Sequence, residues 1–280
     1  MNRTAADRVL LARVAGTRGE DAGLARAAVL LARTECPDAD PDRVEARLTA
    51  LASEVRARGA SASTGTERAG VLAAVLAVGA GLRGNHEAYD DPRNSCLECV
   101  LDRRLGLPLT LSMVWMETGR RAGWRVEGVG LPGHFLVRIH GSDGGSTLAD
   151  PFHGGAALSR PDLKHLLHSL TGQPVTLSGL ELGGRSPGDL LLRMLRNLRA
   201  SYRRRSDRLR GISVAEDMLL VSPGLPEALR DRGLWRIEGG ERREGLADLR
   251  AFVEAAPSDP GAEGVLRLLT TLTADADHAN

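Results

Sequence analysis

Apolar positions at helical spacing dominate the first part of the chain. Leucine, valine and alanine recur every three or four residues, at Val9, Leu10, Val14, Leu24, Ala28 and Leu31. Pro37 and Pro41 interrupt this pattern before a further helix that we predict over residues 44–55. A short apolar run over residues 71–82 is typical of a buried helix. We therefore expect residues 1–83 to form a helical part of the fold.

Two helix signals follow in the middle of the chain. Asn94 and Ser95 are residue types that cap helices, and they precede a predicted helix that runs through Arg104. Pro108 suits the first turn of a second helix, which we expect to end near Ala122.

Strand patterns begin directly after these helices. Residues 126–131 and 135–140 form two strand-like runs, and a glycine-rich turn at 141–145 leads into a third strand ending at Asp150. Helices that lead into a short antiparallel sheet indicate an α+β core, which we assign to residues 84–180.

The last third of the chain returns to helical spacing. One predicted helix face carries Leu191, Leu195, Leu198 and Tyr202. A repeat of about 34 residues, the tetratricopeptide length, relates Leu195 to Leu229, Met218 to Phe252 and Pro223 to Pro257. We expect residues 188–280 to form two helical hairpins, so the fold class is α+β and mostly helical.

Composition narrows the class of protein. The 280 residues are 42% apolar and 26% charged with a net charge of +1, which excludes wholesale disorder and argues against general nucleic-acid binding. No apolar run approaches the roughly 20 residues of a membrane span, and three cysteines are too few for a disulfide framework. The sequence thus predicts a cytoplasmic protein without a membrane partner.

A cluster of arginines is the one strong local charge. It comprises Arg193, Arg196, Arg199, Arg203, Arg204, Arg205, Arg208 and Arg210. Aromatic residues are almost absent from it, so a solvated helix face is favoured over binding of phosphate or RNA. We regard nucleic acid as an unlikely partner.

The densest set of reactive residues surrounds His134 and Asp150. His134 begins one predicted strand and Asp150 ends the next, so adjacent antiparallel strands can bring the side chains together. A carboxylate that accepts the imidazole Nδ1–H would make His134 a general base. A purely structural hydrogen bond is the alternative.

Three segments of this chain resemble the bacterial transglutaminase-like family with C-terminal tetratricopeptide repeats. They are NSCLECVLDRRLGLPLTLS at 94–112, GVGLPGHFLV at 128–137 and DPFHGG at 150–155. RTECP at 33–37 and the helical tail also fit the family, so the resemblance covers most of the chain.

The resemblance implies a papain-like Cys-His-Asp site. His134 and Asp150 match its last two members. Gly106 and Ser112 match the residues that flank the family's cysteine, which places Pro108 at the position of the nucleophile. Proline cannot attack a carbonyl carbon, so acyl transfer through a thiol at this point is not expected.

Other residues near these motifs remain candidates for the site. Cys96 and Cys99 form a Cys-x-x-Cys pair, which suggests redox chemistry or a zinc site with His134 and His153 as further ligands. Packing of each thiol in the core is the favoured alternative. The residues that we expect to line a cleft are Asn94, Cys96, Pro108, Thr110, Ser112, Phe135, Phe152 and His153.

Three hypotheses for the function follow. The first is an enzyme in which His134 and Asp150 perform acid–base chemistry on a small-molecule or peptide substrate that carries an acyl, amide or carbonyl group. The reaction would be cyclisation or hydrolysis of a biosynthetic intermediate, and we expect it to need no cofactor or metal. The second is a non-catalytic scaffold that binds a peptide or protein through residues 188–280. The third is a thiol enzyme that uses Cys96 from a displaced position.

Overall fold

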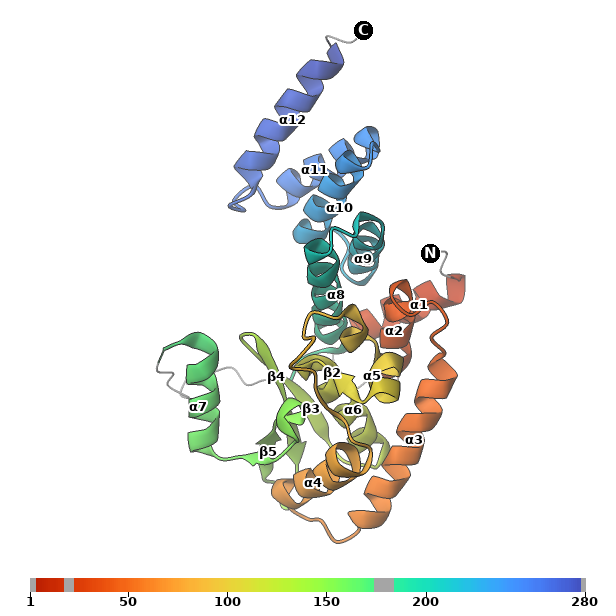
Figure 1. The fold of residues 1–280 in the computed structure, drawn as a ribbon, viewed down its shortest axis with the longest axis vertical. Coiled ribbons are helices and arrows are strands. Elements are labelled where there is room, and N and C mark those ends of the chain that lie inside the picture. Colours follow the sequence, from red (N-terminus) through yellow and green to blue (C-terminus); the bar gives the residue numbers. More distant parts are fainter. Residues whose placement is uncertain (1–3, 18–22, 174–183, 278–280) are drawn as a thin grey trace.

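The computed structural model describes residues 4–17, 23–173 and 184–277, with the side chains of the last helix described to residue 272. A rounded part holds the sheet and the helices around it, and the C-terminal helices extend away from that part (Figure 1). The predicted end of the core at residue 180 lies outside the described residues. The α+β, mostly helical fold class is confirmed.

The N-terminal part is helical, as predicted. It consists of α1 (Ala5–Gly16), α2 (Leu24–Leu31), the 3₁₀-helix η1 (Ala32–Thr34), α3 (Pro41–Arg58), α4 (Gly65–Leu72) and the π-helix η2 (Ala73–Gly79). The apolar run over 71–82 is therefore only partly the buried helix that we expected: Val75 and Leu76 are buried, but Val78 is 81% exposed. The wider turn of a π-helix changes the face on which each side chain lies.

Side chains that bond the first turn determine where several helices begin. In a capping box, a Ser or Thr accepts from the backbone three residues on, and the acidic residue there accepts from the cap. Such boxes start α1, α4, α7 (Arg160–Thr171) and α8 (Pro187–Arg204), through Thr4 with Asp7, Thr64 with Glu67, Ser159 with Asp162 and Ser186 with Asp189.

The two helices predicted in the middle of the chain are present, with one different start. Helix α5 covers Leu97–Arg103, and its N-cap is Cys96 rather than Asn94 or Ser95. Those two residues belong to the 3₁₀-helix η3 (Pro92–Ser95), because Asp91 caps that earlier turn through the backbone N–H of Arg93. Helix α6 covers Pro108–Arg121, as expected.

A four-stranded antiparallel sheet follows α6. Its strands lie in chain order: β3 (Val126–Leu131), β4 (His134–His140), β5 (Ser146–Ala149) and β6 (Ala157–Leu158). Strand β4 begins at His134, which pairs with Leu131 across the β3–β4 turn. A separate parallel pair joins β1 (Arg83–Gly84) to β2 (Leu105–Gly106).

Both faces of the sheet are covered by helices. Phe135, Val137 and Ile139 pack into the main core with α6, whereas Leu136 packs with leucines of α7. This alternation is the period of two that a strand buried on both faces requires. The sheet and α6 thereby fix the position of His134, the first residue of β4.

The C-terminal helices are α8, α9 (Arg208–Val221), α10 (Pro226–Glu238), α11 (Arg242–Ala255) and α12 (Ala262–Asp277). Helix α8 packs on both α9 and α1, so it joins the repeats to the N-terminal part. The predicted 34-residue offset relates α8–α9 to α10–α11. It pairs Arg199, which bonds Glu227, with Gly233, which packs against Leu249.

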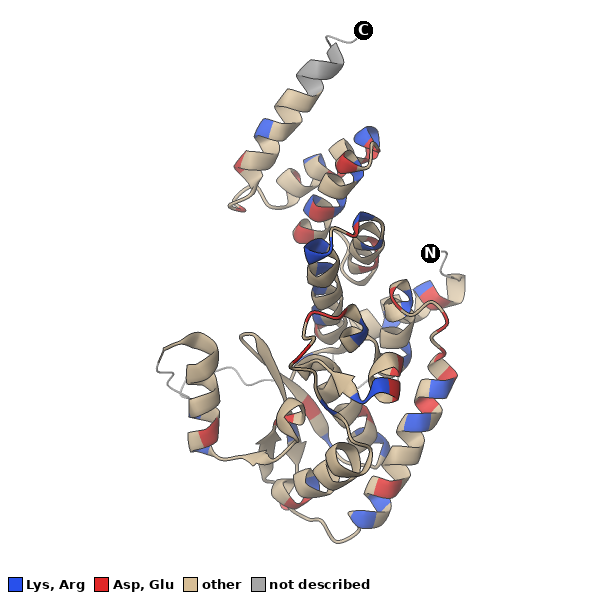
Figure 2. Cartoon of the chain, in the orientation of Figure 1, with Lys and Arg blue, Asp and Glu red and all other residues tan. Residues whose placement is uncertain are grey.

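Carboxylates accompany the arginine cluster. Arg196 and Arg199 pair with Glu227, Arg204 pairs with Asp90, and Arg210 pairs with Asp207. Basic and acidic segments are interspersed along these helices (Figure 2). Five of the arginines are exposed, as a solvated face requires: Arg196, Arg203, Arg204, Arg205 and Arg210. Arg193, Arg199 and Arg208 differ from that prediction because they are partly buried. In the described part of the chain, no helix combines the length and apolar character needed to cross a membrane.

Candidate functional site

A two-residue turn places His134 at the start of β4. Pro132 and Gly133 connect β3 to β4, and Gly133 has a φ of +68°. Proline followed by a glycine with positive φ fits a type II turn. The hairpin therefore holds His134 on ordered backbone rather than in a loose loop.

The Asp150 carboxylate is held by its own turn. Asp150 caps the 3₁₀-helix η4 (Pro151–His153), with Oδ1 accepting from the backbone N–H of Phe152 at 3.0 Å. Its other oxygen, Oδ2, lies 2.7 Å from His134 Nε2 and 2.8 Å from His153 Nδ1. One buried carboxylate oxygen thus joins two imidazoles.

The ring nitrogen that faces Asp150 is Nε2, not the Nδ1 that we expected. Strands β4 and β5 pair Val137 with Ala149, so the same register would set Asp150 opposite Leu136. His134 is therefore a diagonal neighbour of Asp150, and such pairs are separated by about 7–8 Å between Cα atoms. The distal nitrogen of the ring spans this distance.

The shared oxygen determines the tautomers of both rings. An ionised carboxylate only accepts hydrogen bonds, so His134 donates from Nε2 and His153 donates from Nδ1. Each neutral ring then keeps a lone pair on its other nitrogen. The free nitrogens of the two histidines are therefore potential bases, and both rings are oriented by the same carboxylate.

The pKa of Asp150 reflects opposing effects. Burial by itself raises the pKa of this carboxyl, but the hydrogen bonds and charges of His134 and His153 outweigh it and lower the pKa below the ordinary value. Asp150 is consequently an anion at neutral pH, as an acceptor of two imidazole N–H groups must be.

Exposure distinguishes the two histidines. The His134 side chain is 6% exposed, whereas that of His153 is 52% exposed. His134 is thus shielded from solvent at the start of β4. In the histidine trio, which we define as His134, Asp150 and His153, it is His153 that reaches solvent.

An aromatic layer lies against the trio. Phe152 is buried, and its ring lies edge-on to His134 at 6.0 Å and to His86 at 4.5 Å between centroids. Tyr89 contacts the same ring at 6.1 Å. Gly84 allows this close packing, because a Cβ there would lie 2.7 Å from Phe152 atoms.

Asn94 and Thr110 act in the scaffold of the site. Asn94 is fully buried, and its side-chain amide donates to the carbonyl of Ala88 at 2.7 Å and accepts from Asn85 Nδ2 at 3.0 Å. Its backbone carbonyl accepts from Thr110 Oγ1 at 2.8 Å. Asn94 therefore ties the loop with His86 and Tyr89 to the start of α6.

Pro108 and Ser112 occupy the buried first turns of α6. Ser112 Oγ lies 3.5 Å from the carbonyl oxygen of Phe135, so this part of α6 is next to the start of β4. Pro108, at the position that the resemblance gives to a nucleophile, is the first helical residue and carries no reactive group. His134, Asp150 and His153 are reactive groups that the structure brings together beside this turn.

Cys96 is sealed in the interior rather than in an accessible cleft. It is 1% exposed, and its Sγ contacts the carbonyl oxygens of Ala32 and Pro92. Burial raises the pKa of this thiol, and the nearby carboxylates of Glu35 and Asp91 raise it further. A protonated, enclosed thiol is a poor nucleophile, which opposes the thiol-enzyme hypothesis.

The cysteines and the histidines form separate clusters. Cys99 is paired with Cys36 in a disulfide, not with Cys96. A mixed zinc site of Cys96, Cys99 and the two histidines is therefore not assembled among the described residues.

His134, Asp150 and His153 also satisfy the donor requirement of a metal. Their ligand atoms all lie within 4.8 Å of one another, and two histidines with one carboxylate are a known set for divalent metals with open positions. The same atoms make the hydrogen bonds described above, so acid–base and metal chemistry would use one geometry.

Arg193 supports the strand next to this trio. It donates to the carbonyl oxygens of His134 and Leu131, and its guanidinium lies 5.2 Å from the centroid of the Phe135 ring. Phe135, the second residue of β4, is buried, so it packs in the core and does not line the accessible cleft that we expected.

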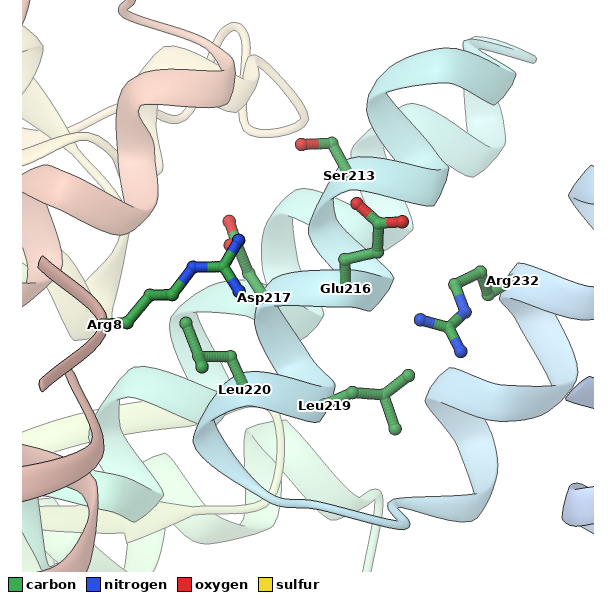
Figure 3. A pocket seen from close by; sticks show the side chains of 7 residues that line it. All are labelled: Arg8, Ser213, Glu216, Asp217, Leu219, Leu220 and Arg232. Atoms are coloured by element: carbon green, nitrogen blue, oxygen red, sulfur yellow. The ribbon is translucent and has the colours of Figure 1, made fainter. Parts of the chain in front are cut away.

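Another cavity lies away from the histidine site. It has a volume of about 410 Å³ between α1, α9 and α10, and Arg8 and Arg232 enter it from opposite sides (Figure 3). The residues that line it are Arg8, Ser213, Glu216, Asp217, Leu219, Leu220 and Arg232. This hollow lies between α1 and the helical tail, away from the histidine site.

Sequence reasoning missed three residues near the site. His86 has no motif around it and reaches Phe152 and His153 only through the fold of the 85–89 loop. Tyr89 and Arg193 likewise come from distant segments. Most aromatic residues of the sequence lie between residues 84 and 155, a signal that includes Tyr89 but neither His86 nor Arg193.

Comparisons with known proteins agree with this architecture. Residues 42–196 match the transglutaminase-like superfamily, and residues 198–270 match tetratricopeptide repeats. A UPF0162 protein of Xylella fastidiosa (strain Temecula1) is 34% identical over 245 residues, which cover 82% of this chain and 83% of the relative.

Two further relatives are similar over shorter stretches. A UPF0162 protein of Pseudomonas aeruginosa is 36% identical over 146 residues, covering 52% of this chain and 53% of its own. Protein SirB1 of Salmonella typhimurium is 26% identical over 176 residues, covering 63% of this chain and 65% of its own.

Proposed function

The chain belongs to the transglutaminase-like UPF0162 family, and on this premise we propose that His134, Asp150 and His153 form an acid–base site for an acyl, amide or carbonyl substrate. The observation that carries the proposal is the shared oxygen: Asp150 Oδ2 lies 2.7 Å from His134 Nε2 and 2.8 Å from His153 Nδ1. A structural hydrogen bond to Asp150 needs only one imidazole. A second imidazole on the same carboxylate oxygen adds a group that can carry a proton.

The two histidines have different roles in this proposal. His134, oriented by Asp150 and shielded by Phe152, uses Nδ1 to take a proton from the attacking water, amine or hydroxyl group. The Asp150 anion stabilises the imidazolium that results. His153, which is half exposed, exchanges protons with solvent.

Hydrolysis of an activated ester tests the proposal without knowledge of the natural substrate. We expect His134→Ala and Asp150→Asn to lower the p-nitrophenyl acetate hydrolysis rate of the full chain by about 10²–10⁴-fold. His165→Ala, on the exposed face of α7, is the matched control and should leave the rate unchanged. An unaltered rate in a folded His134→Ala variant would contradict the acid–base role.

The thermal midpoint separates catalysis from structure. The acid–base proposal expects His134→Ala to keep a cooperative unfolding transition, with a midpoint lowered because the buried Asp150 carboxylate loses one donor. A variant that loses its cooperative unfolding transition would instead assign His134 a structural role.

A second candidate function is partner binding by the helical tail. Tetratricopeptide repeats generally mediate protein interactions, and the 410 Å³ hollow between α1 and the tail helices α9 and α10 favours this function. Leu219→Glu would place a charge in this hollow. Loss of a partner in a pull-down with that full-length variant, and its retention by His134→Ala, would favour a scaffold over an enzyme.

A further inference from the structure

All three cysteines of the chain meet at one point of the interior. Cys36 follows η1, Cys96 caps α5 and Cys99 lies in the first turn of α5. Their Sγ atoms all lie within 4.8 Å of one another, although 63 residues separate Cys36 from Cys99. The three cysteine sulfurs of the chain therefore form one cluster.

The backbone spacing at this cluster exceeds that of most disulfides. The Cα atoms of Cys36 and Cys99 are 7.5 Å apart. Disulfides usually span about 4.4–6.8 Å between Cα atoms. Sulfurs that share a tetrahedral zinc ion stand roughly 3.8 Å apart, given Zn–S bonds of about 2.3 Å, so a bridging ion suits the wider spacing.

Two carbonyl oxygens lie near the Sγ atom of Cys96. The carbonyl oxygens of Ala32 and Pro92 approach the same sulfur at 3.8 and 3.7 Å. The partial negative charge of these oxygens disfavours a bare thiolate, and a bound divalent ion would offset that repulsion.

From this geometry we propose that Cys36, Cys96 and Cys99 in the reduced chain bind one zinc ion, a site separate from the histidine trio. A dithiol first reduces the disulfide, yielding the thiols of Cys36 and Cys99 and an oxidised dithiol. Zinc then replaces three thiol protons, which pass to solvent, and water completes its coordination. Cys36 and Cys99 are only partly buried, which leaves an approach for the ion.

Cobalt(II) binding to the full chain tests the zinc site, because thiolate ligands give cobalt strong charge-transfer absorption. After anaerobic reduction and removal of the reductant, we expect one equivalent of cobalt to bind with a tetrahedral spectrum that zinc abolishes. Cys96→Ser should weaken binding by about 100-fold or more. His153→Ala, which removes a ligand of the other metal candidate, should leave the cobalt affinity unchanged.

Three results would overturn the zinc site. They are the lack of a thiolate–cobalt spectrum in the reduced chain, a spectrum that Cys96→Ser does not alter, and a spectrum that His153→Ala removes. If circular dichroism shows that Cys96→Ser does not fold, the half-buried Cys99→Ser variant decides by the same criterion.

Discussion

Arg193 donates a hydrogen bond of 2.7 Å to the backbone carbonyl oxygen of His134. The same nitrogen donates to the carbonyl of Leu131 at 3.1 Å, so one guanidinium spans the turn that positions the histidine. Burial lowers the pKa of Arg193 because it disfavours the charged guanidinium, and the charges of Arg185 and Arg196 lower it further. Helix α8, which leads into the repeats, is thereby connected to the candidate site.

Arg193→Gln should disturb the histidine site without unfolding the chain. Its shorter, neutral side chain leaves one or both carbonyls without a donor, at a cost of about 1–3 kcal/mol. We expect a lower ester hydrolysis rate and shifted imidazole resonances of His134. Histidine NMR spectra and chemical unfolding measure the two effects.

Arg196→Gln is the control for Arg193→Gln. Arg196 lies on the same helix but pairs with Glu227 at a more exposed position. Its loss should change the free energy of unfolding by less than about 1 kcal/mol and leave the histidine resonances in place. Equal effects from both substitutions would argue against a specific role for Arg193.

The proximity of His134 and Asp150 could be predicted from local rules. Pro132-Gly133 indicates a tight turn, the glycine-rich segment after His140 indicates the next, and antiparallel pairing then brings the two residues together. Such turns set the register between neighbouring strands, so the proximity of His134 and Asp150 can be predicted without knowing how the rest of the chain packs.

The other contacts of the site could not be predicted in the same way. His86 and Arg193 reach it from a loop and from α8, and no sequence spacing links them to β4. The choice of Nε2 depends on the diagonal placement of His134 and Asp150. The pairing of Cys36 with Cys99 likewise depends on how η1 packs near α5.

Asp150→Asn should reduce stability in a way that depends on pH. The folded-state pKa of Asp150 lies below its ordinary value, so folding favours the anion. The contribution of ionised Asp150 to the free energy of unfolding is present above the unfolded-state pKa, about 4, and is lost as pH falls through the folded-state pKa. The two proteins should therefore differ most near neutral pH and converge in acid.

Urea unfolding across this pH range measures the difference between the Asp150→Asn variant and the unsubstituted chain. Asp143→Asn, in the exposed β4–β5 turn, provides a carboxylate control away from the histidines. A stability difference for Asp150→Asn that stays constant from neutral pH into acid would contradict the linkage.

Gly155→Ala should destabilise the segment that carries Asp150. Gly155 has a φ of +78°, which disfavours any side chain, and a Cβ there would collide with the ring of Trp115. Strain and overpacking together predict a loss of about 2–4 kcal/mol. Thermal unfolding measures it. Gly154→Ala shares the positive φ but meets nothing within 4 Å, so it should cost about 1–2 kcal/mol.

Tyr202→Phe tests how α8 is fastened to the N-terminal part. The buried Tyr202 hydroxyl donates to Glu35 Oε2 at 2.9 Å, and its pKa is raised by burial and by that carboxylate. Phenylalanine keeps the packing but removes a donor to a charged group, which should cost about 1.5–3 kcal/mol in unfolding free energy. Tyr89→Phe alters a tyrosine that is 45% exposed, and it should cost well under about 1 kcal/mol. If both substitutions cost the same, the hydrogen bond to Glu35 does not hold α8 in place, and the packing of the ring alone accounts for the attachment.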